Sequence, residues 1–123
     1  MRRGLLLAAV LIVLVAIAHS YLGERYILRR LFRRADLPHL FGSDRFTRRT
    51  LRFAWHITSV AWLGLAGVLV VVAAPGPPAR GALLLTVAAA FLGSAAIAVV
   101  GSRGRHLSWV VFTAIALLAW FAA

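Results

Sequence analysis

The sequence predicts an all-α membrane protein, a four-transmembrane-helix bundle with an interfacial amphipathic helix between helices 1 and 2. Hydrophobic residues make up 63% of the 123 residues, and the mean hydropathy is +0.92, whereas a soluble domain is only about half apolar. The apolar residues also fall into long runs separated by arginine-rich or proline-rich segments. At this length we expect one membrane domain, residues 1–123.

Four spans follow from the apolar runs. The first is expected at 4–22, and a helix of that length reaches about 28 Å, close to the roughly 30 Å of a bilayer's hydrocarbon core. The second is expected at 53–74. The proline-rich segment 75–78 ends it, because proline lacks a backbone N–H and clashes with the preceding turn. The remaining spans are expected at 81–101 and 106–123, joined by a short polar turn.

The segment 23–50 is predicted to be cytoplasmic and amphipathic. Within it, 23–35 is expected to form a helix along the membrane surface, with Ile27, Leu28 and Leu31 on its apolar face. Such a helix presents its arginines to anionic lipid phosphates; the simpler alternative is that it only anchors the loop. The expected lipid-binding residues are Arg25, Arg29, Arg30, Arg33 and Arg34.

Arginine placement predicts the orientation in the membrane. All 14 basic residues are arginines; nine lie between the first two spans and two in the turn before the fourth, against three on the opposite side. By the positive-inside rule, the arginine-rich side is cytoplasmic and both termini lie outside a bacterial-type inner membrane. A cleavable signal peptide ending near Ala18 is the alternative, and the charge bias argues against it.

The third span is rich in small residues, which indicates close contact with another helix. Ala89, Gly93 and Gly101 lie on one stripe. Small side chains let helices approach closely where no hydrophobic effect drives their association. We therefore expect close packing within the bundle or between copies of an oligomer.

Three histidines are expected at the cytoplasmic end of the bundle. His19 lies in the last turn of the first span, His56 near the start of the second and His106 at the start of the fourth. Imidazole binds metals and haem, and it also hydrogen-bonds quinones and relays protons. The alternative is that each histidine lies singly at the interface. Ser20 and Ser59 add polar neighbours at this level.

Glu24 adjoins the histidines and, if it faces the bundle, needs an arginine or imidazole partner. The candidate cofactor-binding residues are therefore His19, His56 and His106, and the candidate metal ligands are His19, His56, His106 and Glu24. A haem or a divalent metal is the cofactor that this cluster would hold.

The functional hypothesis depends on this histidine cluster alone. The chain has no cysteine, no phosphate-binding loop and no nucleophile motif, so we do not expect an enzyme. The hypothesis is a small inner-membrane protein that binds a metal, haem or quinone and acts as an accessory subunit of a membrane complex. The alternatives are a small oligomeric channel or transporter, and a purely structural membrane subunit. The expected partners are membrane lipids with anionic headgroups and further subunits, including copies of itself. Membrane orientation explains the net charge of +11 without nucleic acid.

Overall fold

The computed structural model describes residues 1–123 as helices joined by turns, with no strands. Helix α1 (Arg2–Leu22) runs directly into a π-helix, η1 (Gly23–Leu28), and then into the single turn α2 (Arg29–Leu31). The other helices are α3 (Arg45–Ala73), α4 (Arg80–Ser102) and α5 (Ser108–Phe121). The continuous helix Arg2–Leu31, α3 and α4 are long and apolar enough to cross a membrane, and α5 is a shorter apolar helix. The predicted all-α class is confirmed.

The predicted interfacial helix over residues 23–35 is not supported. Gly23 has ordinary helical angles (φ −61°, ψ −48°), so α1 continues through it to Leu31. The reason is a close contact with α3: a Cβ atom added at Gly23 would lie 2.1 Å from Nε1 of Trp55. Packing against this indole holds the segment beside α3. The π-helix also breaks the expected apolar face, because Leu28 is buried while Ile27 is 50% exposed.

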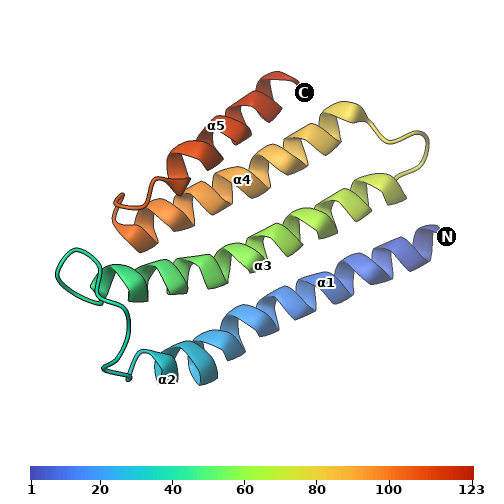
Figure 1. Ribbon diagram of the computed structural model, residues 1–123. Coiled ribbons are helices and arrows are strands. Elements are labelled where there is room, and N and C mark those ends of the chain that lie inside the picture. Colours follow the sequence, from blue (N-terminus) through green and yellow to red (C-terminus); the bar gives the residue numbers. More distant parts are fainter.

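The helices form a single layer in the order α1, α3, α4, α5 (Figure 1). Neighbours in this layer are antiparallel, and contacts occur only between adjacent helices: α1 with α3, α3 with α4, and α4 with α5. Because α1 contacts neither α4 nor α5, the layer does not close into the expected bundle. Only 14 of the 123 residues are buried, so both faces of the layer are largely open.

Buried small residues recur every seven positions on three helices. A seven-residue spacing keeps one stripe turned toward a neighbouring helix, and small side chains let the two backbones approach. The stripes are Ala9, Ala16 and Gly23 on α1 and η1, Ser59, Ala66 and Ala73 on α3, and Ala88, Ala95 and Ser102 on α4. Between α3 and α4, two residues of the predicted stripe make such contacts. A Cβ atom added at Gly93 would lie 3.3 Å from the side chain of Val60. One added at Gly101 would lie 2.5 Å from the side chain of Phe53.

Arg48 fastens the loop between α2 and α3. Its guanidinium group donates to the backbone oxygens of Phe32 and Arg34, the latter at 2.8 Å. It also pairs with Asp44, four residues earlier, where Nε lies 2.8 Å from the carboxylate. Asp44 is the N-cap residue of α3 but makes no side-chain cap bond. Arg48 thereby satisfies carbonyl groups at the end of α2 and fixes that end beside α3.

Candidate functional site

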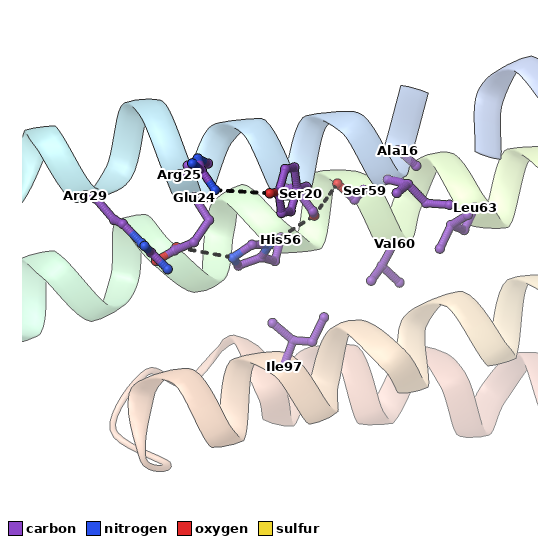
Figure 2. A pocket seen from close by; sticks show the side chains of 12 residues that line it. Ala16, Ser20, Glu24, Arg25, Arg29, His56, Ser59, Val60, Leu63 and Ile97 are labelled. Atoms are coloured by element: carbon purple, nitrogen blue, oxygen red, sulfur yellow. Dashed lines mark hydrogen bonds and ion pairs between the residues drawn. The ribbon is translucent and has the colours of Figure 1, made fainter. Parts of the chain in front are cut away.

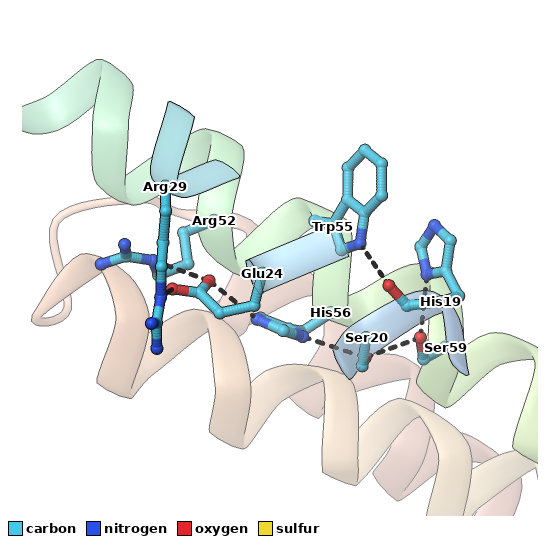
Figure 3. Close-up of polar contacts among 8 residues, drawn as sticks. All are labelled: His19, Ser20, Glu24, Arg29, Arg52, Trp55, His56 and Ser59. Atoms are coloured by element: carbon cyan, nitrogen blue, oxygen red, sulfur yellow. Dashed lines mark hydrogen bonds and ion pairs between the residues drawn. The ribbon is translucent and has the colours of Figure 1, made fainter. Parts of the chain in front are cut away.

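Charged side chains meet at the arginine-rich end of the interface between α1 and α3 (Figure 3). One carboxylate oxygen of Glu24 lies 3.2 Å from Nε of Arg52 and 3.7 Å from Nε2 of His56, and the other lies 3.8 Å from Nε of Arg29. We call these four residues the Glu24 cluster. Glu24 thus has both kinds of partner expected for it, and its side chain is 27% exposed. The cluster ties η1 and α2 to α3.

A chain of hydrogen bonds leads from this cluster through the helix interface to His19. The Nδ1 of His56 lies 3.0 Å from Ser20 Oγ, Ser20 donates to Ser59 Oγ at 2.8 Å, and Ser59 Oγ lies 3.0 Å from Nδ1 of His19. Each hydroxyl group can donate or accept, and each Nδ1 donates or accepts according to the tautomer of its ring, so the chain can carry its protons in either direction. The two histidines are therefore linked through two hydroxyl groups.

His19 is fixed by aromatic rings. Its imidazole stacks on Trp55 with ring centroids 4.5 Å apart and an interplanar angle of 1°, and Trp62 lies 4.9 Å away. The Trp55 indole also donates to the backbone oxygen of His19 at 3.0 Å. Gly23 provides the space for this indole against α1. The chain of hydrogen bonds thus ends at the ring of His19, which two tryptophan side chains hold in place.

His106 lies apart from the other two. Its Nδ1 is 2.9 Å from Ser108 Oγ, and its ring packs against Phe53 at 5.1 Å and Phe46 at 6.0 Å. It precedes α5 and packs on α3, whereas His19 lies on α1 and bonds to Ser59. No group of three or more His, Asp or Glu side chains could hold a metal ion. The structure therefore gives no support to a metal or haem site made by His19, His56, His106 and Glu24.

A groove of about 650 Å³ opens beside the Glu24 cluster, over α3 and between α1 and α4 (Figure 2). It exists because α1 and α4 do not touch, so one face of α3 is left as its floor. Its polar end contains Ser20, Tyr21, Glu24, Arg25, Arg29, His56 and Ser59. Its apolar end contains Ala16, Ile17, Val60, Leu63 and Ile97. The groove thus offers hydrogen-bonding groups at one end and a hydrocarbon surface at the other.

The five arginines expected to bind lipid have different surroundings. Arg29 belongs to the Glu24 cluster, and Arg34 pairs with Asp36 at 2.8 Å. The hydrogen bond from Arg34 lowers the pKa of the Asp36 carboxyl to about 2. Arg25 donates to the hydroxyl of Tyr21 at 3.3 Å. The remaining two, Arg30 and Arg33, are exposed.

Some residues of the site were missed by the sequence reasoning. Arg52 was counted only as a topology-setting charge, although it lies four residues before His56 and therefore on the same helix face. Ser20 and Ser59 were named only as polar neighbours, not as the link between two histidines. The stacking of Trp55 on His19 had no sequence signal, since it depends on which helices are adjacent.

Comparisons with known proteins assign no function to this arrangement. No protein-family model matches the chain, and neither the curated proteins nor the solved structures gave a match.

Proposed function

We propose that this chain is an integral membrane protein that binds a neutral amphiphile of the quinone class in the groove between α1, α3 and α4. The observation that carries the proposal is the division of the groove into a polar and an apolar end. Small-molecule sites are mostly apolar with a few well-placed polar groups. A ring head group fits the end near His56, and an isoprenoid tail fits the end near Leu63 and Ile97.

The charges at the polar end favour a neutral head group. The Glu24 carboxylate already engages Arg29 and Arg52, so an anionic head group would compete with an existing carboxylate. Quinone carbonyl oxygens need only hydrogen-bond donors. His56 can supply an N–H, and the hydroxyl of Tyr21 accepts from Arg25 and keeps its own proton free to donate.

The hydrogen-bonded chain beside the groove supports the quinone class in particular. A quinone and its quinol differ by protons as well as electrons, so groups that exchange protons are needed near the carbonyl oxygens. His56 and Glu24 are titratable and line the groove, and the chain continues from His56 through Ser20 and Ser59 to His19. A packing site for an inert lipid would not require this arrangement.

Binding of decylubiquinone to the full-length protein in nanodiscs tests the proposal, with equilibrium dialysis as the readout. The His56→Leu variant should bind about fivefold more weakly, since a hydrogen bond contributes about 1 kcal/mol net. The matched control is His106→Leu, which removes a histidine outside the groove and should bind like the wild type. Equal affinities of the two variants would contradict the proposal, as would tighter binding of oleate than of decylubiquinone.

We also propose that α1, α3, α4 and α5 all span a bacterial-type inner membrane, with both termini outside. This is supported by three helices of sufficient length and by arginines gathered at the end of the layer opposite the termini (Figure 1). Reporter fusions after Arg34 and Gly104 should report cytoplasm, and fusions after Gly76 and Ala123 should report the outside. A periplasmic signal from the Arg34 fusion would reverse the assignment.

A packing role in a larger membrane assembly is a second candidate, favoured by the open layer. Large apolar side chains such as Val100, at 77% exposed, and Leu118, at 73%, are left largely uncovered by the chain. Lipid covers such side chains, and so do neighbouring subunits. Native mass spectrometry from mild detergent should then show a defined oligomer or co-purifying subunit, whereas a homogeneous monomer would argue for the ligand-binding role alone.

A further inference from the structure

Four arginines that do not belong to the Glu24 cluster gather at the loop end of α3. Arg45 and Arg49 lie on the first two turns of α3, and Arg103 and Arg105 lie in the turn between α4 and α5. Arg49 is close enough to the other three for their positive charges to act on it. We call these residues the unpaired arginine cluster, because none of them forms a salt bridge or donates a side-chain hydrogen bond within the chain.

No acidic side chain is left to neutralise this cluster. The chain has three acidic residues, and each is engaged elsewhere. Glu24 pairs with Arg29 and Arg52 in the Glu24 cluster. The other two pairs are Asp36 with Arg34 and Asp44 with Arg48. Positive charges held together repel one another, so an anion from outside the chain would be stabilised here.

The cluster surrounds a small cavity. A volume of about 190 Å³ is lined by Arg45, Arg49 and Arg105, with Ser43 and Ser102 beside them. Arginine presents paired N–H donors that match the oxygens of a phosphate group. The cavity is also more enclosed than a surface patch, because the loop residues Leu40 and Phe41 and the α3 residue Phe46 complete its wall.

The rim of the cavity is apolar. Phe41 is 85% exposed and Leu40 is 47% exposed, and both line the cavity. Phe41 is held in place by an edge-to-face contact with Phe46, with ring centroids 5.2 Å apart. Aromatic and aliphatic side chains next to arginines are typical of the boundary between headgroups and acyl chains. A free phosphate ion has no apolar part that could contact this rim.

From this geometry we infer that the unpaired arginine cluster binds the phosphate of an anionic phospholipid headgroup. The guanidinium groups of Arg45, Arg49 and Arg105 hold the phosphate. Phe41 and Leu40 contact the start of the acyl chains. The site uses none of the five arginines predicted from the sequence. It is separate from the proposed quinone groove, and neither site depends on the other.

Lipid titrations of the full-length protein in detergent, followed by native mass spectrometry, test the inference. The probes are dioleoyl phosphatidylglycerol, dioleoyl phosphatidylcholine and inorganic phosphate. Wild type should bind phosphatidylglycerol at least tenfold more tightly than phosphatidylcholine. The double variant Arg49→Gln/Arg105→Gln should lose at least tenfold in phosphatidylglycerol affinity, because each arginine near an anionic surface contributes substantially.

Two control variants lose the same charge elsewhere. Arg2→Gln/Arg3→Gln changes the opposite end of α1, and Arg30→Gln/Arg33→Gln changes the segment predicted from the sequence; both should keep phosphatidylglycerol binding within about twofold. An equal loss in all three variants would overturn the inference. Displacement of the lipid by millimolar inorganic phosphate would instead assign the cavity to the free ion and also overturn it.

Hydrogen exchange on the wild type keeps the test decisive if the double variant does not fold. Phosphatidylglycerol should protect the amides of residues 40–49 and 103–106 more than phosphatidylcholine does. Equal protection by the two lipids would contradict the assignment.

Discussion

The Glu24 cluster and the unpaired arginine cluster lie at the same end of the layer and use arginines of the same helix, α3. They differ by one carboxylate. In the first, Arg52 and Arg29 lie within 4 Å of Glu24 and help to join η1 and α2 to α3. In the second, the guanidinium groups have no acidic partner within the chain. On α3, Arg52 is within reach of Glu24 and takes part in packing between helices, whereas Arg45 and Arg49 have no carboxylate partner and line a cavity.

The largest effect should come from Gly23, which positions one cluster and not the other. In Gly23→Ala the new Cβ would meet the Trp55 indole at 2.1 Å, and overpacking costs about 1–3 kcal/mol. This exceeds the gain of up to about 1 kcal/mol in helix propensity, so the free energy of unfolding should fall. Unfolding in mixed micelles of increasing SDS content measures the change.

The matched control for this substitution is Gly4→Ala, since nothing lies within 4 Å of a Cβ atom at Gly4. It should be neutral or slightly stabilising. Phosphatidylglycerol binding should survive in Gly23→Ala, because the unpaired arginine cluster lies on α3 and the turn after α4. Loss of lipid binding together with stability would show that the two clusters are not independent.

A smaller effect should follow when Glu24 loses its charge. In Glu24→Gln, Arg29 and Arg52 lose their carboxylate, and the partly exposed position limits the loss of stability to about 1 kcal/mol. The same change leaves a second group of arginines without an acid, so the variant should bind more phosphatidylglycerol per protein than wild type. Native mass spectrometry counts the bound lipids.

The control for that experiment is Asp36→Asn, which removes a carboxylate from the exposed loop. Its partner Arg34 lies apart from the Glu24 cluster, so this variant should keep wild-type stability and a smaller increase in bound lipid. An unchanged lipid count in Glu24→Gln would mean that internal pairing does not decide which arginines bind anions.

The smallest expected effect concerns the exposed pair of Arg34 and Asp36. Because the pKa of Asp36 is lowered from 3.8 to about 2, the pair favours the folded loop above pH 3.8, and this contribution is lost as the pH falls through about 2. In Arg34→Gln the pKa of Asp36 should return toward 3.8. NMR titration of the Asp36 carboxyl in micelles measures both values, and an unchanged pKa would show that the pair is not formed in solution.

The sequence predicted the helices well because long apolar runs and proline-rich breaks are local signals. The expected span 81–101 matches α4 (Arg80–Ser102), whereas α3 begins at Arg45, well before the apolar run at 53. Which helices are neighbours could not be read from the sequence, and this is why His106 was expected beside His19 although its ring packs on Phe46 and Phe53 of α3.

The surroundings of Glu24 show a second limit. Projecting η1 as an ordinary α-helix, at 100° per residue, gave a membrane-facing stripe of Ile27, Leu28 and Leu31. A π-helix turns less per residue, so this projection fails after Gly23 and buries Leu28 while exposing Ile27. The expected partners of Glu24 could still be named, because a carboxylate among arginines and histidines has few alternatives.

A layer one helix thick has a consequence for cooperativity. In a closed bundle every helix supports at least two others, so the loss of one contact weakens all of them. Here α1 contacts α3, α3 contacts α4, and α4 contacts α5, with no contact across the layer. Stability in such an array is close to a sum of neighbouring interfaces, as in repeat proteins. We therefore expect the α1–α3 hairpin to form as soon as both helices are inserted, and to persist when the α4–α5 pair opens.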